Sequence, residues 1–228
     1  MKNRVALFLS GSGYLDGSEI TEATSLVIAL SKHDVAVDFF APNRSQLNTV
    51  NHLSGQTADE TRNILTESAR IARGQIKPLN EFNAELYDAI ILPGGFGAVK
   101  NFTTFLEDGI NGSLHSDIKT ALLDAIAHQK WIVGICAAPL VIAIAMRDAE
   151  QTNATLTFGQ SSGATDFIPA LNAWGIKHID TKINEYYLDK EHRIITSGAY
   201  MFHDAKPYDI YLCADFVIET LLKQLRNH

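Results

Sequence analysis

Cys136 lies at a junction between an apolar stretch and a helical pattern. Residues 131–135 (WIVGI) predict a buried strand, and a helical segment follows Cys136 to about Arg147. Such a strand–turn–helix junction presents its side chain at the edge of a sheet, and the N–H groups and dipole of the next helix favour a thiolate. The pattern predicts a nucleophile elbow. A small buried core cysteine remains an open alternative, because free cysteines are commonly buried.

A glycine-rich turn follows a second strand pattern. Residues 87–92 (YDAIIL) predict the strand, which runs into residues 93–97 (PGGFG). Glycines let a backbone approach a ligand closely and point N–H groups at it. Together with the N–H of Ala137, the N–H of Gly95 could stabilise an oxyanion, with Gly94 beside it. A tight strand-to-helix connection is the alternative.

Two glutamates stand three residues apart at the start of a helix predicted over residues 19–32. Glu19 and Glu22 can share one face of that helix, and Asp16, three residues before Glu19, indicates a capping box. Acidic residues in a first helical turn are normally solvated partners of the helix dipole. Because this helix follows the glycine loop after the first strand, a carboxyl here could instead reach the cysteine and act as an acid or base.

Other residues support weaker interpretations. The loop over residues 10–17 (SGSGYLDG) and Asp38 suggest dinucleotide binding, but the spacing G-x-G-x-x-x-G does not match that motif. The eight histidines have no metal-binding spacing, so no metal site is predicted. His203 follows a strand pattern closely enough to approach a site, although a surface or packing role is favoured. Cys213, in an apolar part of the last helix, is predicted to face the core.

These groups need a scaffold in which strands and helices alternate. Strand patterns cover residues 4–9, 35–40, 87–92 and 131–135, and helical patterns cover residues 19–32, 59–73, 116–129 and about 209–225. Weaker patterns predict a strand at 155–158, a helix near 166–174 and a hairpin within 185–196. The alternation predicts an α/β fold with a mainly parallel sheet, helices on both faces, and ligands at the carboxyl ends of the strands.

Length and composition exclude several classes of protein. A chain of 228 residues is expected to form one domain over residues 1–228. The formal net charge of −7 argues against a strongly basic nucleic-acid binder, and two cysteines exclude a disulfide scaffold. No targeting segment and no apolar run long enough to cross a bilayer are visible, so no membrane partner and a cytoplasmic location are expected.

Seven segments together resemble one family. They are residues 9–22 (LSGSGYLDGSEITE), 40–43 (FAPN), 51–55 (NHLSG), 60–74 (ETRNILTESARIARG), 92–101 (LPGGFGAVKN), 136–139 (CAAP) and 195–201 (ITSGAYM). On these segments the chain resembles the PfpI-protease-like branch of the class I glutamine amidotransferase-like superfamily. Within it, the chain is most similar to the ElbB-type or ES1 subfamily, also called "isoprenoid biosynthesis, amidotransferase-like".

The resemblance implies a flavodoxin-like, three-layer α/β sandwich with Cys136 as the nucleophile. It also implies a helix-borne glutamate hydrogen-bonded to the sulfur, for which Glu22 fits best and Glu19 second. Gly95 and Ala137 match the N–H groups of the oxyanion site. Members of the subfamily are described as glyoxalases that need no cofactor, and homodimers are common in the superfamily. The resemblance therefore implies a small 2-oxoaldehyde substrate and no cofactor.

One departure limits what the wider superfamily implies. Amidotransferases and protease-like members place a histidine shortly after the helix that follows the nucleophile, whereas residues 155–165 (TLTFGQSSGAT) contain none. Glutamine hydrolysis by a Cys-His-Glu triad and peptidase activity are therefore not expected.

Two functional hypotheses follow. In the first, glyoxal or methylglyoxal forms a hemithioacetal on Cys136, Glu22 shuttles a proton, and water releases a 2-hydroxy acid. In the second, the protein is a non-catalytic stress-response protein that senses oxidants or binds a small metabolite through the same cysteine.

Overall fold

The central sheet follows from apolar runs that are covered on both faces. The computed structural model describes residues 2–226. Its seven-stranded sheet has the order β10-β11-β7-β6-β1-β2-β5, and every neighbouring pair is parallel except β10 with β11. The strands are β1 (Arg4–Phe8), β2 (Ala36–Ala41), β5 (Ile76–Pro78), β6 (Ala89–Leu92), β7 (Trp131–Ile135), β10 (Tyr186–Asp189) and β11 (Ile194–Ser197). All residues of β6 and β7 are buried, as expected for the middle of a parallel sheet.

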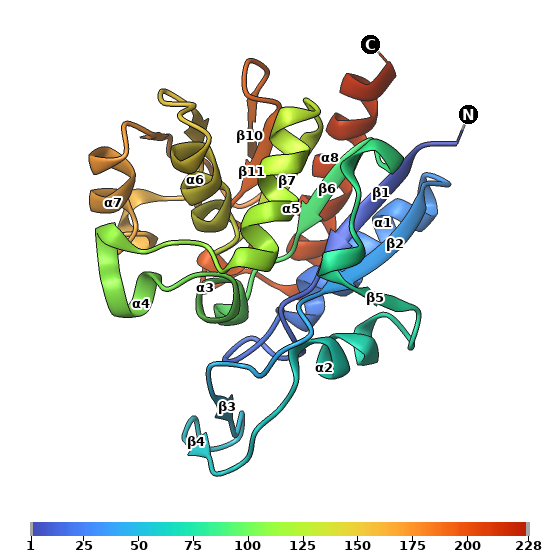
Figure 1. Cartoon of the computed structure of the whole chain (residues 1–228). Helices are drawn as coiled ribbons and strands as arrows, with labels where there is room; N and C mark the ends of the chain where they lie inside the picture. The colour runs from blue at the N-terminus through green and yellow to red at the C-terminus, as the bar shows by residue number, and fades with distance from the viewer. Residues whose placement is uncertain (1, 227–228) are drawn as a thin grey trace.

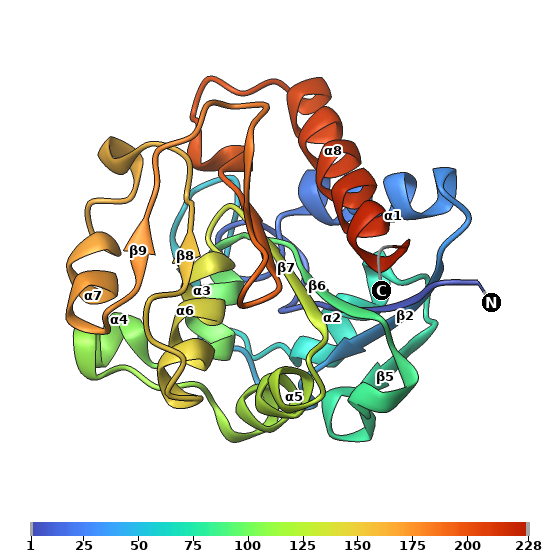
Figure 2. The ribbon, with the colours of Figure 1, turned by 90° about the horizontal axis from the view of Figure 1, so that it is seen from above.

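Helices cover the two faces of this sheet. They are α1 (Ile20–Lys32), α2 (Ile64–Ile71), α3 (Phe96–Phe102), α4 (Phe105–Asp108), α5 (Ser116–Ala127), α6 (Pro139–Asp148), α7 (Ile168–Ala173) and α8 (Pro207–Arg226). In Figure 2, α1 and α8 lie side by side on one face, and α5 lies on the other. The predicted α/β fold is therefore confirmed, with the three layers of a flavodoxin-like sandwich. None of the helices within residues 2–226 is long and apolar enough to cross a membrane.

Two small sheets lie outside the main one. The hairpin of β3 (Thr49–Val50) and β4 (Thr57–Ala58) projects from the body of the molecule at the bottom of Figure 1. The pair β8 (Thr155–Leu156) and β9 (Lys177–His178) lies next to α7. Neither the β3–β4 hairpin nor the short helices α3 and α4 are predicted by the sequence patterns.

Two local predictions about helix starts are wrong. The helix predicted from residue 59 begins at Ile64, because the backbone before it pairs with residues 44–46 and the Asn63 side chain caps the helix at Thr66 N. The capping box at Asp16 does not form. Glu19 itself is the N-cap of α1 and accepts from Glu22 N at 2.6 Å, while the Asp16 carboxylate accepts from Val50 N in the hairpin.

Candidate active site

Cys136 forms a nucleophile elbow at the end of β7. Its φ of +60° lies in the left-handed region, which is strained for a residue with a side chain and is typical of such turns. The Cys136 N–H donates to Ser197 O of β11 at 2.9 Å, and α6 begins at Pro139, whose ring suits a first helical position. The adjacent strand, the elbow turn and α6 hold the sulfur at the carboxyl edge of the sheet.

Glu22 is fully buried and touches the same sulfur. Its Oε2 accepts from Gly94 N at 2.9 Å, its Oε1 accepts from Tyr200 N at 3.1 Å, and its carboxyl forms a hydrogen bond with the Cys136 thiol group. Burial, together with the negative charge of Glu19, raises the pKa of Glu22 from 4.5 to about 8. Its hydrogen bonds offset only part of that shift, so the carboxyl is mostly protonated at neutral pH.

The glycine turn packs against both the Cys136 side chain and the Glu22 carboxyl. A Cβ on Gly94 would lie 2.5 Å from the Cβ of Cys136 and 2.7 Å from Oε2 of Glu22, so only glycine is accommodated there. Gly95 adopts a φ of +94°, and a Cβ on it would meet the carbonyl oxygen of Gly17 at 2.4 Å. The N–H groups of Gly95 and Ala137 both donate to the Cys136 sulfur. These are the two N–H groups that the sequence analysis predicted for the oxyanion site.

The pKa of the Cys136 thiol is shifted in the opposite direction from the one that the helix start alone predicts. Burial raises the pKa of the Cys136 thiol well above its usual range, and the negative charge of Glu22 acts in the same direction. The Gly95 and Ala137 N–H groups oppose this increase without cancelling it. The expectation that the start of α6 would yield a low thiol pKa is therefore corrected, because desolvation outweighs the helix dipole here. Two acidic groups in contact hold at most one negative charge between them near neutral pH.

Glu19 takes a different position from Glu22. Its carboxylate is tied to the backbone at the start of α1, and its N–H donates to Gly94 O at 2.9 Å. The side chain is partly exposed and lines a cavity of about 440 Å³ whose wall also includes Gly95, Cys136 and Ala137. Of the two glutamates that the sequence left open, Glu22 is the one that contacts the sulfur.

Several lining residues come from segments that showed no functional pattern. Tyr14, Phe167, Tyr200 and Met201 lie on this cavity together with His203, which the sequence analysis favoured as a surface or packing residue. Only the nearness of residue 203 to a strand end signalled its place. The others come from separate loops that the fold brings together.

The structure does not support dinucleotide binding at the glycine loop and Asp38. Asp38 lies within β2 rather than at its carboxyl end, and its Oδ2 accepts from Arg4 Nε at 2.8 Å and from the Tyr87 hydroxyl at 2.9 Å. The glycines of residues 10–17 instead allow close packing under the Gly95 turn: a Cβ on Gly97 would lie 2.3 Å from the Cα of Gly17.

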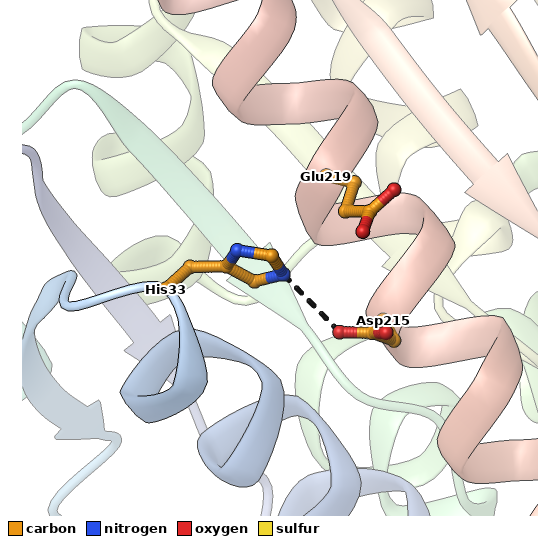
Figure 3. A group of neighbouring side chains, drawn as sticks. All are labelled: His33, Asp215 and Glu219. Atoms are coloured by element: carbon orange, nitrogen blue, oxygen red, sulfur yellow. Dashed lines mark hydrogen bonds and ion pairs between the residues drawn. The ribbon is translucent and has the colours of Figure 1, made fainter.

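One group of side chains has the composition of a metal site. Within residues 2–226, His33, Asp215 and Glu219 offer ligand atoms within 4.8 Å of one another where α1 meets α8 (Figure 3). However, Lys32 Nζ lies 2.6 Å from Asp215 Oδ2, so an ammonium group already balances this carboxylate. His33 Nε2 lies 3.2 Å from the other oxygen. The cluster joins α1 to α8, and Lys32 lies ten positions after Glu22 along α1.

Two curated proteins are similar to this chain over most of its length. The chain is 38% identical over 210 residues to human glutamine amidotransferase-like class 1 domain-containing protein 3, covering 90% of this chain and 77% of that protein. It is 36% identical over 203 residues to the rat ES1 protein homolog, covering 87% and 75%. No family model matches the chain. Both relatives are named as mitochondrial proteins, which overturns the expectation of a cytoplasmic location.

Solved structures show the same fold. A crystal structure of an isoprenoid biosynthesis protein with an amidotransferase-like domain from Ehrlichia chaffeensis superposes with a TM-score of 0.87 at 31% identity, covering 97% of this chain and 99% of that one. Glyoxalase III from Candida albicans shares the fold, with a TM-score of 0.61 at 14% identity over 97% of this chain and 96% of that one.

Proposed function

Because this chain belongs to the family of ES1 and glutamine amidotransferase-like class 1 domain proteins, we propose that its site catalyses a cofactor-independent glyoxalase reaction. The substrates are glyoxal or methylglyoxal plus water, and the product is a 2-hydroxy acid. The observation that carries this proposal is the contact between Cys136 and a buried Glu22 whose pKa is raised to about 8. A general base works best when its pKa lies near the operating pH, and this carboxyl fulfils that condition.

The reaction begins when the Cys136–Glu22 pair carries one negative charge. The sulfur attacks the aldehyde carbon C1, the C=O π bond breaks, and the thiol proton ends on the aldehyde oxygen, which gives a hemithioacetal. The Gly95 and Ala137 N–H groups, which point at the sulfur in the free protein, are placed to stabilise the negative oxygen as it forms.

Glu22 then moves a proton from one carbon to the next. Its carboxylate removes the hydrogen on C1, the C1–H electron pair becomes a C1=C2 double bond, and the C2=O π electrons move onto the C2 oxygen. The C1 hydroxyl proton passes to that oxygen, which gives an enediolate. The same carboxyl then returns its proton to C2 while the C1 oxygen forms a C=O bond, which leaves a thioester on Cys136. Water attacks that carbonyl, the C–S bond breaks, and the hydroxy acid and the free thiol are released. The sum adds one water to the 2-oxoaldehyde with no external oxidant or reductant.

The backbone around Glu22 supports this shuttle. The Gly94 and Tyr200 N–H groups hold one carboxylate oxygen each, so the carboxyl has a fixed orientation beside the sulfur. Glu19, bound to the start of α1, lacks that contact and is assigned no proton transfer. Replacing Glu22 should therefore lower the activity much more than replacing Glu19.

Product analysis in D₂O tests the proposal. Methylglyoxal converted through an enediol should give lactate with deuterium at C2, because the Glu22 proton exchanges with solvent, whereas a direct hydride shift would retain the C1 hydrogen. Cys136→Ser and Glu22→Ala should lower kcat/KM by roughly 100-fold or more, and Glu19→Ala by much less.

Cys213→Ser is the matched control for the cysteine. This residue lies in α8 and donates its S–H to the Ser197 hydroxyl, so its replacement should leave turnover unchanged. Absence of any acid product from wild-type protein would refute the glyoxalase proposal and favour a sensing or binding role for the same cysteine.

A further inference from the structure

The cavity above Cys136 is much larger than the substrates considered so far. Its volume is about 440 Å³, within the range of pockets that hold drug-sized ligands. An apolar cavity of roughly 150 Å³ already accommodates benzene. Methylglyoxal has five non-hydrogen atoms and would leave most of this space filled with water.

Aromatic and apolar side chains form most of the wall beyond the sulfur. The relevant ones are Tyr14, Phe96, Phe167, Tyr200 and Met201. Flat apolar ligands gain from stacking and edge contacts with such rings. The cavity wall therefore matches a planar hydrocarbon group better than a methyl group or a hydrogen atom.

These walls are held in place in the free protein. The Phe167 ring packs against the rings of Phe105 and Phe158, with centroids 5.8 and 5.1 Å apart. The Phe96 N–H donates to Tyr14 O at 2.7 Å, which joins two walls. The Tyr14 ring meets the His52 ring edge-on at 5.5 Å, so the β3–β4 hairpin braces it. A ligand entering a wall fixed in this way loses less free energy in ordering the protein.

The charges on the cavity disfavour an anionic substituent. Glu19 and Asp166 line it, and within residues 2–226 no lysine or arginine does. A carboxylate on the ligand would lie near two acidic side chains, with no lysine or arginine in the described lining to pair with, which costs binding free energy.

From these observations we propose that the preferred substrates of this site are neutral aryl-substituted 2-oxoaldehydes, of which phenylglyoxal is the simplest. This proposal rests on the glyoxalase function above and specifies its substrate class. The dicarbonyl group reacts at Cys136 as described, and the aryl group lies against the aromatic side chains of the cavity wall. Phe96, Phe167 and Met201 would then determine specificity.

Turnover of three compounds tests the preference. Phenylglyoxal should have a kcat/KM at least about tenfold above that of methylglyoxal, since one methylene group in an apolar pocket is worth roughly tenfold or more. The kcat/KM of the matched acid 4-carboxyphenylglyoxal should fall well below that of phenylglyoxal. Asp166→Asn should narrow this difference, whereas Asp59→Asn, which changes an exposed carboxyl outside the cavity lining, should not. A wild-type preference for methylglyoxal over phenylglyoxal would overturn the proposal.

A substitution in the wall provides a second test. Phe96→Ala should lower the ratio of phenylglyoxal to methylglyoxal kcat/KM by about fivefold or more, because a large contact is lost. Its side chain is 49% exposed, so the fold should tolerate the change. Tyr208→Ala, which removes an exposed aromatic ring outside the cavity, is the control and should leave the ratio unchanged. An unchanged ratio in Phe96→Ala would contradict the assignment of this wall.

A binding measurement separates this proposal from the glyoxalase function. The diketones 1-phenyl-1,2-propanedione and 2,3-butanedione have no aldehyde to be oxidised to an acid, so their binding does not depend on turnover. The phenyl compound should protect Cys136 from iodoacetamide at concentrations at least about tenfold lower. Equal protection would refute the aryl preference even in an active enzyme. Selective protection without acid product from any aldehyde would refute the glyoxalase function alone.

Discussion

Replacing the buried carboxyl should change how the stability of the fold depends on pH. Glu22 has a pKa of about 8 in the folded protein and 4.5 as its ordinary value, so the folded state binds this proton more tightly than the unfolded chain does. A raised pKa of this kind contributes stability that is complete below pH 4.5 and is lost as the pH rises through 8. At 1.36 kcal/mol per pH unit, complete ionisation costs about 5 kcal/mol.

Glu22→Gln removes this titration. Between pH 5 and pH 8 the wild-type protein should lose on the order of 3 kcal/mol through Glu22, and the variant should not. The variant has its own cost of about 1–3 kcal/mol at every pH, because its NH₂ group faces one of the two backbone N–H donors that the carboxyl accepts. The wild-type and variant stability curves should therefore converge as the pH increases.

Urea unfolding followed by circular dichroism from pH 5 to pH 8 measures this difference. The range stays below the pKa of about 8.5 of a cysteine in an unfolded chain, so the thiol adds little to the comparison. Glu67→Gln is the matched control: Glu67 is also buried, but it is paired with Arg62 and Arg70. That variant should keep the wild-type slope of stability against pH. Parallel curves for wild type and Glu22→Gln would show that this carboxyl does not titrate near pH 8.

Three further outcomes are expected. Below pH 8, kcat/KM for a 2-oxoaldehyde should rise about tenfold per pH unit and then level off, because one proton must leave the Cys136–Glu22 pair; a pH-independent profile would contradict this. Gly94→Ala should reduce kcat by about 100-fold in steady-state assays, because its Cβ would lie 2.5 Å from the Cys136 Cβ and separate the sulfur from Glu22; near wild-type turnover would disprove the required close approach. Mild peroxide should oxidise Cys136, which lines the cavity, before Cys213, which is buried away from it, and peptide mass spectrometry that found equal rates would reject this order.

Local sequence patterns were sufficient to predict the strand that ends at Cys136 and the glycine turn beside it. The apolar run 131–135 ends at Cys136 in the sequence and in the structure, because a strand covered on both faces must be continuously apolar. The glycines at 94 and 95 mark a close approach of backbone that no other residue type allows. The alternation of strands and helices then placed both segments at one edge of a parallel sheet.

Three features of the site could be assigned only from the tertiary structure. Glu19 and Glu22 are equivalent by spacing, and only the cap at Glu19, which sets where α1 begins, turns Glu22 toward the sulfur. The direction in which the pKa of the Cys136 thiol shifts depends on its burial, and no local sequence pattern predicts that burial. The walls at Tyr14, Phe167 and Met201 come from loops separated by up to 187 positions, and their meeting is a consequence of topology. Sequence spacing describes neighbours along one element, whereas desolvation and the shape of a cavity arise from elements that meet only in the tertiary structure.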